Sequence, residues 1–86
     1  MIVLLHQSFK KAYKKKPMSV RKRFDERLTL FIKNPFDQIL DNHPLSGEWA
    51  GYRSINVTGD YRAVFKQQAD ATIFVDIDTH HNLYGS

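Results

Sequence analysis

Three short runs in the second half of the chain alternate apolar and polar residues, and this alternation constrains the fold more than any other feature. The runs span residues 48–56, 60–66 and 71–78, with Gly59 and Asp70 in the segments between them. A period of two residues is typical of β-strands with one buried and one solvated face. Because short connections join antiparallel neighbours, we predict a three-stranded antiparallel meander.

The register of this meander follows from matching the apolar residues of neighbouring strands. In the last two runs these residues are Tyr61, Ala63 and Phe65, and Ile73, Val75 and Ile77. Directly opposite residues point to the same face, so the match places Tyr61 opposite Val75 and requires a loop of three or five residues around Gln68. The same rule places Ile55 opposite Tyr61.

This register gathers polar side chains on the other face of the sheet. It places Ser54 opposite Arg62, and Asp60 opposite both Asn56 and Asp76. The expected polar set is Asn56, Asp60, Arg62, Asp76 and His80. A sheet face in contact with water carries polar residues in any protein, so a solvated surface and a functional site both fit this pattern. Arg53 falls on the core side, which suggests fraying or a bulge at the start of its strand.

The first 35 residues predict a strand followed by two helices. Ile2–Leu5 is a short apolar run, typical of a buried strand. Two apolar stripes with helical spacing follow, at Phe9, Ala12 and Tyr13, and at Val20, Phe24, Leu28 and Phe31. Pro17 separates the helices, Ser19 is the expected N-cap of the second, and Pro35 ends it. The helices form a basic hairpin against the sheet.

Chain length and composition favour one α+β domain over residues 1–86. Eighty-six residues sustain only one modest core. Residues 36–46 read as an irregular connection with a short turn at Gln38–Leu40. There is no cysteine, which excludes disulfides and thiolate metal sites. The opening MIVLLHQSF is too short for a signal peptide or a membrane span, so we expect a cytoplasmic protein without membrane contacts.

Positive charge is concentrated at the N-terminal end. Residues 1–33 carry ten lysines and arginines against two acidic residues, a net charge of +8, whereas the whole chain carries +4. A basic surface of this kind attracts polyanions such as nucleic acid or an acidic protein partner. A solvated helical surface without a partner gives the same pattern.

Arginine, histidine and aromatic residues are the candidates for chemistry. The planar fork of Arg62 suits phosphate oxygens, and an ion pair with Asp60 or Asp76 is the alternative. His80 and His43 can donate or accept protons near neutral pH. Tyr84 suits base stacking, proton donation or anchoring of the C-terminal tail. Trp49 suits either the core or a base platform.

The sequence contains little that indicates a cofactor or metal site. The chain lacks a glycine-rich phosphate loop, a nucleophile elbow and a dinucleotide fingerprint. His43, His80 and Asp60 together have zinc-ligand chemistry, but their spacing does not match a zinc motif. We expect neither a metal nor a cofactor.

Two motifs carry a resemblance to a known family. The segment HPLSGEWAGYRSINVTGDYRAVF and the terminal IDTHHNLYG resemble RelE/YafQ-type toxins of bacterial type II toxin–antitoxin systems, within the RelE/ParE superfamily. The resemblance is close over residues 42–85 and extends to the rest of the chain by layout. It implies a RelE-like fold and a ribosome-dependent messenger-RNA endonuclease, or mRNA interferase.

The resemblance also implies roles for single residues. His43, Asp60 and His80 match acid, base or positioning groups, and Arg62 matches an arginine that contacts the scissile phosphate in RelE-like members. Tyr84 falls where relatives have Tyr or Phe. One departure from the YafQ-like pattern is an asparagine at position 56, where such members have histidine. Asn56 can bond a phosphate or a base but cannot shuttle protons.

The implied reaction is attack of a ribose 2′-OH on the adjacent phosphorus, without a metal. The implied partners are the ribosome, mRNA and a cognate antitoxin protein. Basic residues on the helices are the expected RNA contacts: Lys10, Lys11, Lys14, Lys15 and Arg21. Two alternatives remain open, a ParE-like toxin that binds DNA gyrase without catalysis and a diverged, inactive RNA-binding member.

Overall fold

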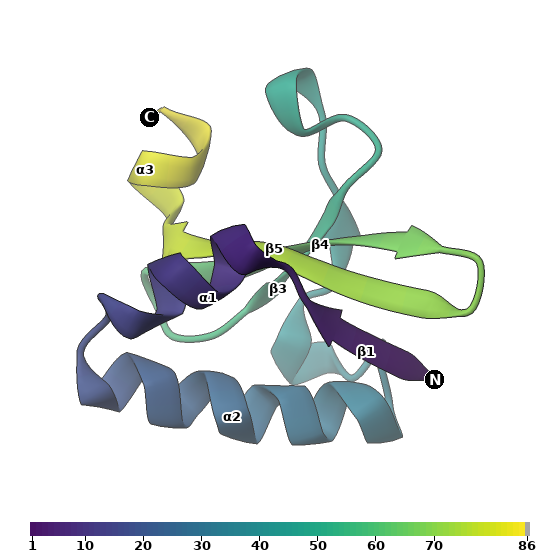
Figure 1. Cartoon of the computed structure of the whole chain (residues 1–86), viewed down its shortest axis with the longest axis horizontal. Helices are drawn as coiled ribbons and strands as arrows, with labels where there is room; N and C mark the ends of the chain where they lie inside the picture. The colour runs from purple at the N-terminus through teal and green to yellow at the C-terminus, as the bar shows by residue number, and fades with distance from the viewer. Residues whose placement is uncertain (86) are drawn as a thin grey trace.

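A five-stranded mixed sheet with two helices against one face makes up the computed structural model, which describes residues 1–85 (Figure 1). The strands are β1 (Ile2–Leu5), β2 (His43–Pro44), β3 (Arg53–Asn56), β4 (Tyr61–Gln68) and β5 (Ala71–Thr79), in the spatial order β1-β5-β4-β3-β2. The helices are α1 (Gln7–Lys14), α2 (Met18–Lys33) and α3 (His80–Tyr84), with 3-10 turns η1 (Gln38–Leu40) and η2 (Gly47–Trp49). The predicted α+β fold is confirmed, although the expected domain end at Ser86 lies outside the described residues.

The core lies between the helices and one face of the sheet. Its buried side chains are Phe9, Val20, Phe24, Phe31, Leu40, Ile55, Val57, Ala63, Phe65, Phe74 and Ile77. Phe24 and Phe74 meet edge to face with ring centroids 5.5 Å apart, which is a favoured aromatic geometry. The two predicted helical stripes are therefore confirmed, with Leu28 half-buried at the rim.

The helix starts differ in detail from the prediction. The N-cap of α1 is His6, whose Nδ1 accepts from the amide of Ser8 at 3.1 Å. The N-cap of α2 is Pro17, and Ser19 lies inside the first turn, so the predicted Ser19 cap is wrong. Pro17 takes this place because its extended backbone precedes the helix and its missing N–H is not needed there.

Strand β1 is exposed rather than buried, contrary to the prediction. Ile2 is 55% exposed and Leu4 is 50% exposed, while Val3 packs on the core. The reason is that β1 is the edge strand of the sheet, parallel to β5. Its apolar run therefore has only one covered side. No described helix is both long and apolar enough to cross a membrane.

The predicted register is wrong by small shifts. Ile55 lies opposite Ala63 instead of Tyr61, a slip of two residues that keeps every side chain on its expected face. Between β4 and β5 the turn has two residues, Ala69 and Asp70, and an irregularity lies between Val64 and Phe65. A bulge of this kind inverts the alternation.

Because of this inversion, the β5 residues that face the core differ from the predicted ones. Phe74 and Ile77 are fully buried, whereas Ile73 and Val75 are only half-buried. The predicted apolar set of the last strand is therefore right only for Ile77. Asp76 lies opposite Val64 rather than Asp60. Alternation alone could not locate the bulge, because both faces of β5 carry apolar residues.

The segment before β3 is a loop rather than the first half of a strand. Residues 48–52, predicted as strand, contain the end of η2 and a turn closed by the Tyr52 amide bonding Trp49 O at 2.9 Å. The predicted turn at Gln38–Leu40 is confirmed, and β2 is an additional short strand on β3.

Arg53 is neither frayed nor bulged: its Nε donates to Asn42 Oδ1 at 2.9 Å, and its guanidinium lies 5.4 Å from the Phe36 ring centroid.

Two carboxylates on the polar face of β5 have shifted pKa values of opposite sign. Partial burial opposes ionisation of Asp78, but the Thr79 amide, the Asn82 side chain and Lys16 outweigh it and lower the pKa of Asp78. Lys16 Nζ lies 3.4 Å from Asp78 Oδ1. Burial raises the pKa of Asp76, although the Ile77 amide opposes the shift.

We predict that Asp78→Asn lowers the stability at pH 7 by about 0.5–1 kcal/mol, or a few degrees in Tm. Because the folded pKa of Asp78 is lowered, its stabilisation is present above the unfolded pKa of about 3.9 and is lost as the pH falls through the folded pKa. Thermal unfolding between pH 3 and 8 should therefore show the difference from wild type closing in acid.

The matched control is Asp76→Asn, for which the expected change in stability at pH 7 has the opposite sign. Because the folded pKa of Asp76 is raised, ionisation of this carboxyl weakens the fold as the pH rises above its unfolded pKa. The asparagine oxygen still accepts from the Ile77 amide, so the variant should have an equal or higher Tm at pH 7. If Asp76→Asn has a clearly lower Tm than wild type at pH 7 but not in acid, the raised pKa of Asp76 is contradicted.

Candidate active site

A pocket of about 700 Å³ lies on the polar side of the sheet, between α3 and the segment from β2 to η2. These two walls rise at the top of Figure 1, while α2 runs along the opposite side of the sheet. The pocket is lined by residues 43–49, His80 and residues 82–85. It brings together three of the predicted site residues: His43, His80 and Tyr84.

His43 enters the pocket from β2, which is paired to β3 opposite Ser54. Its Nδ1 lies 2.9 Å from the backbone oxygen of Asp41 and 3.7 Å from the Asp41 carboxylate. The imidazole is about half exposed. One ring nitrogen is thus held by the protein, which leaves Nε2 available to a substrate.

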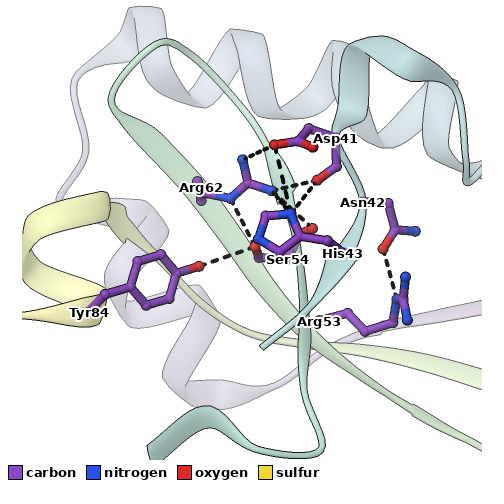
Figure 2. Close-up of polar contacts among 7 residues, drawn as sticks. All are labelled: Asp41, Asn42, His43, Arg53, Ser54, Arg62 and Tyr84. Atoms are coloured by element: carbon purple, nitrogen blue, oxygen red, sulfur yellow. Dashed lines mark hydrogen bonds and ion pairs between the residues drawn. The ribbon is translucent and has the colours of Figure 1, made fainter. Parts of the chain in front are cut away.

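Arg62 lies behind His43 rather than in the lining of the pocket, and Figure 2 shows its contacts. The residue is only 8% exposed. Its Nε donates to Ser54 Oγ at 2.8 Å, and Nη1 donates to the Asp41 carboxylate at 3.3 Å. Its Nη2 donates to the backbone oxygens of Asp41 at 2.7 Å and Ser54 at 3.2 Å. Four of the five N–H donors of this buried charge therefore have oxygen acceptors, which offsets much of the cost of desolvating the guanidinium.

The acidic partner of Arg62 differs from the two predicted partners. Asp60 and Asp76 were the expected ion-pair residues, but the carboxylate within reach belongs to Asp41. Asp41 ends η1 and lies 21 positions earlier in the chain. The Arg62 side chain extends across β3 toward β2, so its acidic partner comes from the segment between η1 and β2.

Tyr84 connects α3 to the same cluster. Its hydroxyl donates to Ser54 Oγ at 3.1 Å, and its ring meets the His80 ring edge to face at a centroid distance of 4.6 Å. Leu83, the next residue toward the sheet, is buried. Leu83 thus anchors the tail, whereas Tyr84 places its hydroxyl and ring in the pocket.

Three contacts fix α3 as a wall of the pocket. Thr79 caps the helix by accepting from the Asn82 amide at 3.2 Å, and the His80 amide donates to Asp60 O at 2.8 Å. Trp49 Nε1 donates to Leu83 O at 3.0 Å, joining the η2 wall to the α3 wall. Trp49 is half-buried, so it is a bridge between the walls rather than a core residue or a free platform.

The other predicted site residues lie outside this pocket. Asp60 lines a smaller hollow of about 390 Å³ with Thr79, His80 and His81. Asn56 lies directly opposite Arg62 on the neighbouring strand but does not line the pocket. Within residues 1–85, no group of three or more His, Cys, Asp or Glu side chains is arranged to hold a metal ion.

The predicted RNA-binding residues lie on the helices. Lys10, Lys11 and Lys14 line a groove of about 450 Å³ between α1 and α2, whose floor includes Phe9 and Phe24. Lys15 is exposed at the end of α1, and Arg21 is half-buried on α2. None of the five lines the pocket that contains His43 and His80.

Sequence reasoning missed Asp41 and Ser54 as contacts of Arg62, and Lys16 as the ion-pair partner of Asp78. The predicted register placed Ser54 directly opposite Arg62. Ser54 in fact lies opposite Val64, two residues away, but its side chain still contacts Arg62, so the register did hint at this contact. Asp41 has no local signal, because its importance depends on where η1 brings it. Lys16 reaches Asp78, which also accepts from Asn82 at 3.1 Å in the pocket wall.

Comparison with known proteins matches this fold and these motifs to one family. The family of YafQ toxins, bacterial toxins of type II toxin–antitoxin systems, matches residues 3–85. The mRNA interferase toxin YafQ of Escherichia coli strain K12 is 35% identical over 60 residues. That match covers 67% of this chain and 65% of the relative, so it spans just under two thirds of the relative's length.

Solved structures agree over almost the whole chain. YafQ from E. coli strain BL21(DE3) superposes with a TM-score of 0.78 at 27% identity, covering 96% of this chain and 97% of that one. YafQ in the E. coli DinJ–YafQ complex superposes with a TM-score of 0.74 at 27% identity, with the same coverage. The resemblance of the two sequence motifs is thereby confirmed, and the chain belongs to the YafQ family of bacterial type II toxin–antitoxin toxins.

Proposed function

We propose that this protein is the toxin of a toxin–antitoxin module and cleaves messenger RNA on the ribosome. The observation that carries the proposal is the meeting of His43, His80 and Tyr84 in one pocket within a YafQ-family fold. The printed name of the E. coli relative, an mRNA interferase toxin, supports the same activity. Two histidines in one pocket suit general acid–base chemistry.

The proposed reaction is an in-line attack of a ribose 2′-oxygen on the adjacent phosphorus. The new O2′–P bond forms as the P–O5′ bond breaks, and the products are a 2′,3′-cyclic phosphate and a free 5′-hydroxyl. We assign His43 as the base that takes the 2′-OH proton, because Nδ1 faces a carbonyl oxygen that can only accept. His80 is the acid that protonates O5′, and no metal is needed in this scheme.

The remaining pocket residues position these groups. The Tyr84 ring packs on His80 and limits the orientations of the imidazole. Asp60 holds the first residue of α3 through its backbone oxygen and lines a separate, smaller hollow together with His80. Asn56 is not needed as a proton carrier, because His43 and His80 supply both the base and the acid.

Partners of the proposed toxin are an antitoxin protein, the ribosome and mRNA, which places its action in the cytoplasm. The groove between α1 and α2 has an apolar floor and a rim of Lys10, Lys11 and Lys14, which suits an acidic amphipathic segment. A YafQ protein in complex with DinJ supports an antitoxin partner. Exposed basic residues such as Lys15 suit salt-sensitive contacts with ribosomal RNA.

We predict that His43→Ala and His80→Ala each slow cleavage of ribosome-bound mRNA by at least about 100-fold, the usual loss for a general acid or base. His81→Ala is the matched control, because His81 adjoins His80 in sequence but does not line the pocket. It should cleave at nearly the wild-type rate. Primer extension on programmed ribosomes measures all three.

Absence of cleavage by the folded wild-type protein would contradict the proposed activity. In that case, inhibition of DNA supercoiling by gyrase would support a gyrase-binding toxin instead. Failure in both assays would favour an inactive RNA-binding member of the family.

The assignment of base and acid has its own test. An mRNA with sulfur in place of the bridging O5′ has a leaving group that departs without a proton, so it needs no general acid. We predict that His80→Ala regains most of its rate on this substrate, whereas His43→Ala stays slow. Rescue of His43→Ala instead would reverse the two roles.

The antitoxin groove predicts a charge-reversal effect. The double variant Lys10→Glu/Lys14→Glu should bind the co-encoded antitoxin at least about tenfold more weakly, because two favourable charge pairs become repulsive. Lys22→Glu/Lys33→Glu changes the net charge equally at exposed positions outside the groove and is the control. Titration calorimetry of both variants measures the difference, and equal losses would place the contact elsewhere.

A further inference from the structure

We propose that Arg62 and Asp41 are positioning residues that hold His43 in one tautomer and orientation, and that Arg62 does not act on the phosphate itself. This inference rests on the proposed function only in taking His43 as a group that exchanges a proton with the substrate. The tautomer itself is a property of the free protein. Figure 2 shows Arg62 and His43 converging on the backbone oxygen of Asp41.

The shared acceptor is the carbonyl oxygen of Asp41. Arg62 Nη2 donates to it at 2.7 Å, and His43 Nδ1 lies 2.9 Å from it. Carbonyl oxygens accept and cannot donate, so a short contact with Nδ1 requires the proton on Nδ1. The Nε2 atom of neutral His43 therefore carries the lone pair.

The hydrogen count on Arg62 supports the same tautomer. Nη2 lies 3.3 Å from His43 Nδ1, and a bond there would put the lone pair on Nδ1 instead. However, Nη2 has two hydrogens, and both have closer oxygen acceptors, Asp41 O and Ser54 O. The contact with Nδ1 is thus the weakest of the three, and the carbonyl determines the proton position.

Asp41 needs to be held, because its backbone is left-handed with φ 46° and ψ 50°. A residue other than glycine is seldom found there unless its surroundings hold it. Arg62 bonds both the carbonyl and the carboxylate of this one residue, and the Arg62 side chain is 10% exposed whereas that of Asp41 is 68% exposed. The buried cation therefore anchors an otherwise solvated loop residue.

A direct phosphate contact is the competing role for Arg62. A guanidinium has five N–H donors, and four of those on Arg62 are engaged by Ser54 and Asp41. Arg62 is also absent from the lining of the pocket. The fifth N–H is on Nη1, and moving the guanidinium far enough to present it to a phosphate in the pocket would break contacts that satisfy a buried charge, which is costly.

The first test reads the tautomer without any activity. Long-range 1H–15N NMR of the folded protein should show neutral His43 protonated at Nδ1. In Arg62→Lys, which keeps the charge but loses the planar fork, a substantial fraction of neutral His43 should move to the Nε2–H form.

Asp41→Ala should cause the same change in the His43 tautomer and replaces Arg62→Lys if that variant does not fold. Asp41→Asn keeps an oxygen acceptor and tolerates the left-handed backbone, so it should resemble wild type. An unchanged tautomer in both disruptive variants overturns the proposal.

The second test is a double-mutant cycle of cleavage rates. If Arg62 acts through His43, Arg62→Lys should slow wild type by about tenfold or more but slow His43→Ala by less than about twofold. Independent losses that multiply would mean that Arg62 acts on the substrate directly, which overturns the proposal. If the wild-type protein does not cleave at all, the proposed function fails, while the NMR result still decides the positioning role.

Discussion

The structure around the pocket depends on one buried charge. Arg62 lies near the start of β4 and is almost fully removed from water, so its guanidinium must find acceptors inside the protein. Those acceptors come from β3 and from Asp41, which follows η1. The same contacts bring His43 to the pocket, because β2 begins two residues after Asp41.

The second wall of the pocket depends on a different kind of contact. The helix α3 has five residues and cannot be stable by itself. It is held by the buried side chain of Leu83, by the Thr79 cap and by the bond from Trp49 to Leu83 O. His80 and Tyr84 therefore keep their places only while the η2 loop and the end of β5 are in place.

The two faces of the sheet separate stability from chemistry. The helical face carries the aromatic core, in which Phe9, Phe24 and Phe74 pack together. The other face carries the pocket and the ionisable residues.

Much of this arrangement could be predicted from the sequence. The helical stripes from Phe9 to Phe31, the presence of three meander strands and the Gln38–Leu40 turn depend on local spacing, and the structure confirms them, except that the first of these strands starts at Arg53. Motifs around His43 and His80 pointed to the family, and the pocket contains both residues. The burial of Ile2–Leu5 and the strand register were mispredicted, because an edge position and a bulge depend on contacts between distant segments.

The sequence by itself therefore determined the type and order of the elements, the family, and the two histidines that line the candidate pocket. Only the tertiary structure decided which groups meet: Asp41 with Arg62, Trp49 with Leu83, and Tyr84 with Ser54. Periodicity reports which side of an element faces the core, since that depends on local spacing. It carries no information on which loop a buried arginine will reach, because that choice is made by the packing of residues far apart in the chain.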